Sequence, residues 1–141
     1  MKNIRFSLLL MVTISGIGIV QSQNKPQTTD KTRVLVYYFH ATSRCPTCLA
    51  IEDNTKKTLE TYFAKEMKDG IIKFRTVNVD EKENYKLAEK YEAGGSALFV
   101  TKIDKGKEMK TDMTNFAFSY GRNNQEKFMS GLKEEISKKL K

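Results

Sequence analysis

The two cysteines of the chain lie three residues apart, at the point where a predicted strand ends and a predicted helix begins. Before them, Arg33 to His40 (RVLVYYFH) is nearly continuous apolar, β-prone sequence, which predicts a strand covered on both faces. After them, Pro46 to Met67 carries apolar residues at three- and four-residue spacing, which predicts a helix. Cys45 and Cys48 are therefore expected at the start of a helix that follows a buried strand.

The remaining sequence predicts an α/β domain. Asp80 with Glu83, and Asn123 with Glu126, have the pattern of helix caps, and Gly94 breaks the chain before a strand. Strands separated by helices are expected to pair in parallel, and a hairpin should add an antiparallel edge to a four-stranded mixed sheet. The predicted elements, in the order β-α-β-α-β-β-α, span residues 33–40, 46–67, 71–80, 80–91, 97–103, 107–113 and 123–140.

The first residues have the layout of a secretory signal peptide. MKNIR carries two positive charges, FSLLLMVTISGIGIV carries none, and small or slender residues precede a cleavage point near Ser22. We expect residues 1–22 to be removed on export to the periplasm or cell envelope, 23–31 to form a polar leader, and 32–141 to form one domain. A retained anchor is the alternative, although the apolar run is short for a membrane span.

The composition gives no sign of a nucleic-acid partner. The formal net charge is +8, and removal of Lys2 and Arg5 with the signal peptide leaves +6. The lysines are scattered and interleaved with glutamates, whereas nucleic-acid binding would require a basic stripe with aromatic residues between the charges. We expect a monomer with a solvated basic surface.

Two neighbouring thiols can form a metal clip, a structural staple or a reversible redox couple. Two cysteines are too few for a disulfide-stapled scaffold, and an exported CxxC pair can cycle or stay oxidised.

A helix N-terminus stabilises a thiolate, so Cys45, with Pro46 fixing the first turn and Arg44 beside it, is expected to have a lowered pKa. Three residues of helix separate two Cα atoms by about 5 Å, which a disulfide can bridge, and Cys48 should be the more buried.

From Thr32 to its C-terminus the chain resembles the thioredoxin family. The resemblance rests on the CPTC motif at a strand-to-helix junction, on the element order, and on KYEAGGSALFV before a glycine-turn hairpin. It implies a three-layer α/β/α thioredoxin-like fold, with Cys45 as nucleophile and Cys48 as resolving cysteine. It also implies an oxidoreductase that needs no bound cofactor and acts on a redox partner protein or disulfide substrate. More narrowly, YYFHATSRCPTCLAIE is similar to exported thioredoxin-like proteins grouped with arsenic-operon nitroaromatic reductase subunits.

Three positions depart from the family pattern. Where the family has a cis-proline facing the cysteines, this chain has Ala97 after Ser96, so a trans peptide or an altered substrate loop is expected. The buried acid that the family carries six residues before the first cysteine is replaced by Phe39. The aromatic residue that usually precedes that cysteine is Arg44.

Glu52 is a candidate substitute for the missing acid. It follows Cys48 by one turn on the same helix face, and its side chain is expected to lean towards the helix N-terminus. Its carboxylate could then serve as the base that helps Cys48 to resolve a mixed disulfide, and partial burial would raise its pKa. The alternative is an exposed glutamate without a role.

His40, the only histidine, suggests an alternative function. Together with Cys45 and Cys48 it would supply three ligands, which suits a soft metal such as Cu(I) but not a closed structural zinc site. The alternative to an oxidoreductase is therefore a thiol-based carrier of Cu(I) or As(III).

Overall fold

The computed structural model describes residues 31–141, so the predicted signal peptide (1–22) and nearly all of the predicted leader lie outside the described residues. No helix within this described range is long and apolar enough to cross a membrane. The elements are β1 (Val34–His40), α1 (Pro46–Tyr62), α2 (Ala64–Lys68), β2 (Ile72–Asn78), the short 3-10 helix η1 (Lys82–Asn84), α3 (Tyr85–Lys90), β3 (Ala97–Asp104), β4 (Lys107–Asp112), α4 (Thr114–Tyr120) and α5 (Gln125–Leu140).

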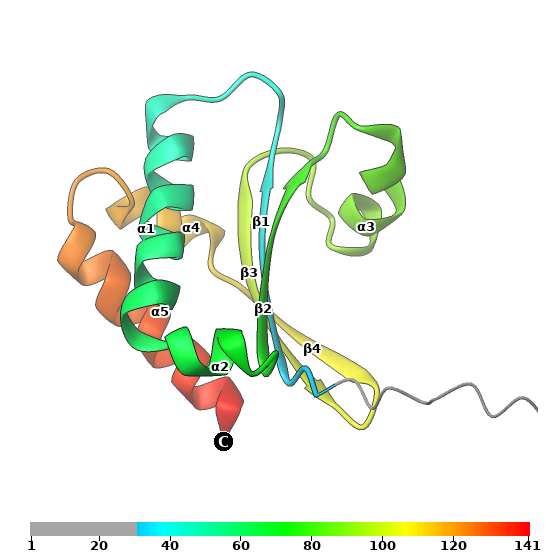
Figure 1. The fold of residues 1–141 in the computed structure, drawn as a ribbon. Coiled ribbons are helices and arrows are strands. Elements are labelled where there is room, and N and C mark those ends of the chain that lie inside the picture. The colour runs from blue at the N-terminus through cyan, green and yellow to red at the C-terminus, as the bar shows by residue number, and fades with distance from the viewer. Residues whose placement is uncertain (1–30) are drawn as a thin grey trace, which may run out of the picture.

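The four strands form one mixed sheet in the order β2-β1-β3-β4 (Figure 1). β1 and β2 are parallel, with Val34 opposite Ile72 and His40 opposite Asn78. β3 runs antiparallel to β1, and β4 antiparallel to β3. Figure 1 shows α1, α4 and α5 over one face of the sheet and α3 over the other. The predicted α/β class, mixed four-stranded sheet and three-layer arrangement are confirmed.

The prediction of parallel pairing is wrong for β3, which pairs antiparallel with β1. The connection from β2, residues 79–96, contains η1 and the short α3 and brings the chain back to the end of the sheet where β2 stops. β3 begins there, since Ala97 pairs with Phe39 near the end of β1, and it runs in the opposite direction.

The helix predicted from Pro46 to Met67 is in fact two helices. α1 ends at Tyr62, and Phe63, with a φ of −135°, separates it from α2 while its N–H still bonds to the Leu59 carbonyl. The side chain of Phe63 is buried in the core. Phe63 follows the buried Leu59 by four residues, so its side chain stays on the core side of the chain across the break.

The two predicted helix caps are wrong, and α4 was not predicted at all. Asp80 does not cap α3, because its carboxylate accepts a hydrogen bond from the backbone N–H of Thr42 at 2.7 Å. The cap of α5 is Asn124 rather than Asn123, and it accepts from the N–H of Lys127 at 3.0 Å. α4 has no side-chain cap that the sequence could have revealed.

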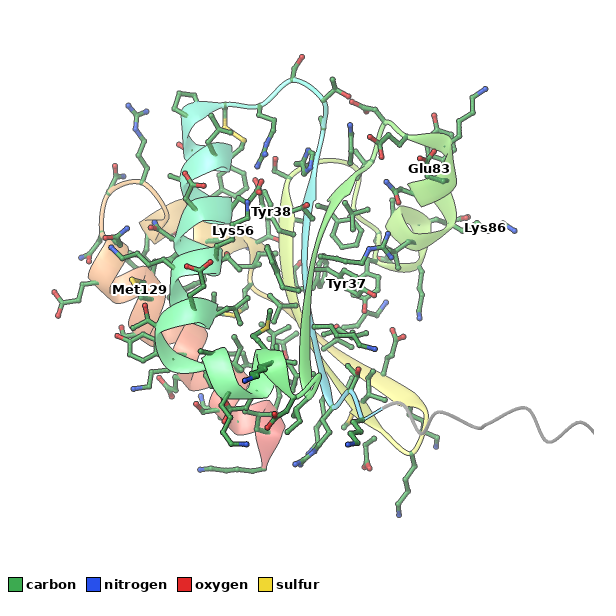
Figure 2. The ribbon with its side chains drawn as sticks, viewed as in Figure 1. Tyr37, Tyr38, Lys56, Glu83, Lys86 and Met129 are labelled. Atoms are coloured by element: carbon green, nitrogen blue, oxygen red, sulfur yellow. A yellow bond between two sulfur atoms is a disulfide. The ribbon has the colours of Figure 1, made fainter. Side chains whose placement is uncertain are left out.

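The side chains of β1 alternate between two separate cores, as expected for a central strand. Tyr38 lies on the face covered by α1, in the core that contains Ile51, whereas Phe39 lies on the α3 face against Tyr91. Figure 2 shows Tyr38 directed towards α1 and Tyr37 directed towards α3. This alternation decides which β1 side chain lies beneath the cysteines.

Candidate functional site

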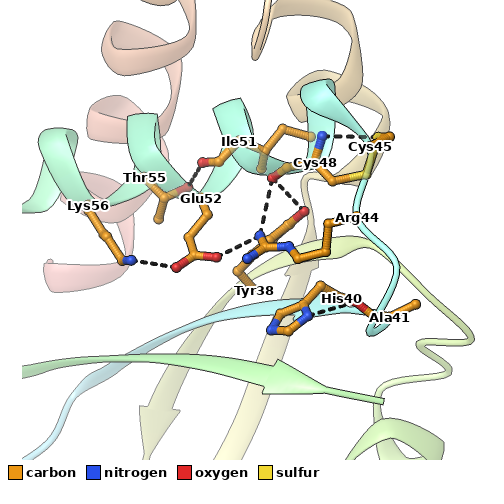
Figure 3. A network of polar contacts seen from close by, with 10 residues as sticks. All are labelled: Tyr38, His40, Ala41, Arg44, Cys45, Cys48, Ile51, Glu52, Thr55 and Lys56. Carbon is orange, nitrogen blue, oxygen red and sulfur yellow. Dashed lines mark hydrogen bonds and ion pairs between the residues drawn. A yellow bond between two sulfur atoms is a disulfide. The ribbon is translucent and has the colours of Figure 1, made fainter. Parts of the chain in front are cut away.

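Cys45 and Cys48 form a disulfide at the first turn of α1 (Figure 3). Their Cα atoms are 5.1 Å apart, as predicted from the helical spacing. Cys45 is the N-cap residue with an extended backbone, and Pro46 is the first residue of the helix. Cys45 is exposed and Cys48 is only 7% exposed, so the predicted difference in burial is confirmed.

The backbone N–H of Cys48 donates a hydrogen bond to Cys45 Sγ at 3.1 Å. This is the N-cap hydrogen bond of a helix, with sulfur in the place of the usual side-chain oxygen. In the reduced protein, the same N–H and the positive end of the helix dipole favour a negatively charged sulfur. The position that was predicted to stabilise a Cys45 thiolate is therefore present.

In the reduced Cys48→Ser variant, the Cys45 thiol is expected to titrate below the roughly 8.5 of a free thiol. The variant keeps the N–H of residue 48 and removes the competing thiol. Ultraviolet absorbance of the thiolate against pH measures the titration, with the unfolded variant in denaturant as the matched reference. A folded-state value equal to the unfolded one would remove Cys45 as the nucleophile.

Tyr38 lies beneath this first turn, although it was not among the site residues predicted from the sequence. Its side chain is fully buried, and its hydroxyl donates to the Cys48 carbonyl at 2.8 Å. The six-residue family spacing points instead to Phe39, which lies on the opposite face of the sheet and contacts Phe99. Placing Phe39 in the position of the buried acid is thus wrong. Successive side chains of a strand point to opposite faces of the sheet, and this alternation along β1 was the signal that could have identified Tyr38.

Arg44 folds back over the first turn of α1 instead of extending into solvent (Figure 3). Its guanidinium lies 5.5 Å from the centre of the Tyr38 ring. Its Nη2 is 2.6 Å from Glu52 Oε2 and 3.4 Å from the Cys48 carbonyl oxygen, and its side chain is 19% exposed. Burial opposes the charge of Arg44, but the contacts with Glu52 and Tyr38 outweigh it and raise its pKa.

The carboxylate of Glu52 contacts two cations. Oε2 pairs with Arg44 and Oε1 pairs with the ammonium of Lys56, and the side chain is 11% exposed. Burial acts to raise the pKa of Glu52, yet the hydrogen bonds from Lys56 and Arg44 lower it overall. The prediction of a raised pKa is wrong because the sequence did not reveal the path of Arg44. The alternative of an exposed glutamate is also wrong.

The loop that leads to Cys45 is tied to the end of β2. The N–H of Thr42 donates to Asp80 Oδ2, and Asn78 Nδ2 donates to Thr42 Oγ1 at 3.1 Å. The N–H of Val79 donates to the His40 carbonyl at 2.8 Å. The hydrogen bond from the Thr42 backbone also lowers the pKa of Asp80. These contacts fix the path of the chain between β1 and the N-cap of α1.

Ser96 and Ala97 lie at the end of the sheet that carries the disulfide, because Ala97 pairs with Phe39 near the end of β1. The described residues contain no cis peptide bond, so the bond before Ala97 is trans, as expected. Both residues line a hollow of about 470 Å³ whose described lining includes neither cysteine. The predicted substrate loop therefore lies at the same end of the sheet as the cysteine turn, and it is not part of the contact network of Figure 3.

His40 is not gathered with the cysteines into a metal site. Its ring stacks against Tyr38 with 6.1 Å between centroids, and its Nδ1–H donates to the Ala41 carbonyl at 3.0 Å. Across residues 31–141, no three His, Cys, Asp or Glu side chains are grouped as ligands of one metal ion. The residues brought together are instead Tyr38, Arg44, Cys48 and Glu52.

Three solved structures resemble the chain in fold. Fasciola hepatica thioredoxin is 22% identical, over 77% of this chain and 83% of that chain, with a TM-score of 0.48. Mitochondrial thioredoxin 3 from Saccharomyces cerevisiae, in its oxidised form, is 18% identical over 77% and 81%, with a TM-score of 0.48. A malarial protein is 19% identical over 62% and 94%, with a TM-score of 0.40. No protein-family model and no curated protein sequence matches the chain.

Proposed function

We propose that this protein is a thiol–disulfide oxidoreductase that works through Cys45 and Cys48. The observation that carries the proposal is a disulfide at a helix N-terminus, with the exposed Cys45 at the cap and the buried Cys48 one turn in. A structural staple is the weaker explanation. The stabilisation that a cross-link gives by constraining the unfolded chain falls as the loop shortens, and here the loop spans three residues.

In the reductive direction, the Cys45 thiolate attacks one sulfur of a substrate disulfide. A bond forms between Cys45 and that sulfur, and the other substrate sulfur leaves as a thiolate. Cys48 then loses its proton and attacks Cys45 Sγ, which forms the Cys45–Cys48 bond and releases the second substrate thiolate. Two electrons pass from the protein to the substrate, and the opposite direction follows the same steps in reverse.

The surrounding residues receive distinct roles under this proposal. Pro46 fixes the first turn and Arg44 adds positive charge near the cysteines, so both favour the Cys45 thiolate. Ser96 and Ala97 present backbone beside the end of β1, where a substrate chain bound at Cys45 would pass. The partner class is a protein or small molecule that contains an accessible disulfide or dithiol.

Equilibration with mixtures of reduced and oxidised glutathione tests the function. We expect the Cys45–Cys48 bond to open and close reversibly in a two-electron transition, at a potential between about −120 and −270 mV, the range of thioredoxin-fold exchangers. The protein should also accelerate reduction of a peptide disulfide by glutathione. A bond that stays closed across the whole glutathione series would show a structural staple and overturn the proposal.

We further propose that the domain acts in the periplasm or cell envelope. The support is the charge and hydropathy pattern of residues 1–22 alone. Fractionation of producing cells followed by N-terminal sequencing provides the test. A mature chain that begins near residue 23 in the exported fraction is expected, and full-length chain in the cytosol would contradict export.

A further inference from the structure

The contacts around Cys48 differ from what a proton-transfer role for Glu52 requires. A base next to the resolving cysteine should have a free carboxylate oxygen near the thiol. Both oxygens of Glu52 are instead occupied, one by Arg44 at 2.6 Å and the other by Lys56. The carboxylate is thus held in its charged form inside a largely buried network.

Arg44 connects this carboxylate to the cysteine turn. It immediately precedes Cys45 in the chain, and its Nη2 contacts both Glu52 Oε2 and the carbonyl oxygen of Cys48. Its position over the Tyr38 ring places the cation against the same turn that receives the Tyr38 hydroxyl. Without Arg44, the buried charge of Glu52 would be left one helical turn from Cys48, with Lys56 as its remaining cation.

From this geometry we propose that Arg44 sets the redox potential of the Cys45–Cys48 couple by neutralising Glu52 at the first turn of α1. The inference rests on the proposed function. Reduction by glutathione converts the disulfide and two glutathione molecules into the dithiol and one oxidised glutathione, so two electrons reach the protein sulfurs. A negative charge beside the turn disfavours the thiolate and the reduced form, and its neutralisation favours them. Arg44 and Glu52 are therefore positioning residues for the couple.

The test measures the glutathione equilibrium constant of reduction for a set of variants. Arg44→Ala is expected to shift this constant at least about tenfold towards the disulfide, which corresponds to about 30 mV more negative. In the Glu52→Gln background, the same Arg44→Ala change should have a much smaller effect, within about threefold, because without the ion pair to Glu52 the guanidinium is no longer held against the first turn of α1. Arg44→Lys keeps the charge and should stay within about threefold of the parent protein.

Lys56→Ala is the matched control. It removes the same charge from the same carboxylate, but Lys56 lies one turn farther from the cysteines and its side chain is 47% exposed. Its effect should therefore stay within about threefold. Arg44→Lys separates loss of charge from loss of packing, because lysine keeps the charge but not the planar guanidinium that contacts the Tyr38 ring and the Cys48 carbonyl.

The possible outcomes separate the two proposals. If the parent protein shows no reversible couple, the oxidoreductase proposal fails. A reversible couple that shifts equally for Arg44→Ala and Lys56→Ala, or equally with and without Glu52, would overturn the role of Arg44. Slower resolution of mixed disulfides in Glu52→Gln at an unchanged potential would also overturn it, and would restore Glu52 as the base.

Discussion

Cys45→Ser is expected to abolish thiol–disulfide exchange. Cys48→Ser is expected to allow the first step, attack on the substrate disulfide, and to prevent release of the mixed disulfide that results. The rate of attack on a small disulfide should fall at least about a thousandfold in Cys45→Ser, since the variant lacks the nucleophile. The remaining thiol belongs to Cys48, which is only 7% exposed behind the first turn of α1. A substrate sulfur has little access to it.

In Cys48→Ser, Cys45 keeps its place at the N-cap, and attack should proceed. With oxidised glutathione, one glutathione should become attached to Cys45 and one should leave as the thiol. No second cysteine can then release the adduct. Mass spectrometry after a fixed incubation of both reduced variants measures the difference. Adducts that form at similar rates on the two variants would contradict the assignment of Cys45 as nucleophile.

Phe39→Asp is expected to cost more than about 4 kcal/mol and to leave the chain unfolded at neutral pH. The change puts an acid six residues before Cys45, where the family pattern has one. In this structure that position has no exposed surface and packs against Tyr91 and Phe99, away from the cysteines. Truncation of a buried phenylalanine to a small side chain costs about 3–5 kcal/mol, and a buried carboxyl without partners adds to that.

Urea unfolding followed by circular dichroism measures this effect. Phe39→Leu is the apolar control, because it also removes the ring but adds no carboxyl, and it should lose only about 1 kcal/mol. In Phe39→Asp, burial raises the folded-state pKa of the new carboxyl above its unfolded value. Any remaining stability should therefore be greatest at low pH and be lost as the pH rises through the folded-state pKa. Native-like stability of Phe39→Asp at neutral pH would show that the face assignment of β1 is wrong.

The parts of the fold that follow local rules could be predicted from the sequence. The strand before the cysteines, the helix that begins at Pro46 and the burial of Cys48 all depend on periodicity and capping within a few residues. The direction of β3 could not be predicted in the same way. It depends on the end of the sheet to which the connection of residues 79–96 returns, and no local pattern in that segment encodes this.

In the candidate site, only the relations between residues close in sequence could be predicted. The proximity of the two cysteines follows from their spacing, and the place of Glu52 one turn after Cys48 follows from helix geometry. The return of Arg44 across Tyr38 is a contact between a loop, a strand and a helix, and no local pattern encodes it. The error in the pKa of Glu52 came from this missing contact, because burial was anticipated and the cations were not.

The double pairing of Glu52 has a consequence for the proton inventory of the redox half-reaction. A buried acid with a raised pKa would take up or release a proton near neutral pH as the sulfurs change state. Arg44 and Lys56 hold the pKa of Glu52 below its ordinary value, so this carboxylate stays charged in that range. Protons that accompany the two electrons should then reside on the sulfurs of Cys45 and Cys48, and the network beneath them should contribute none.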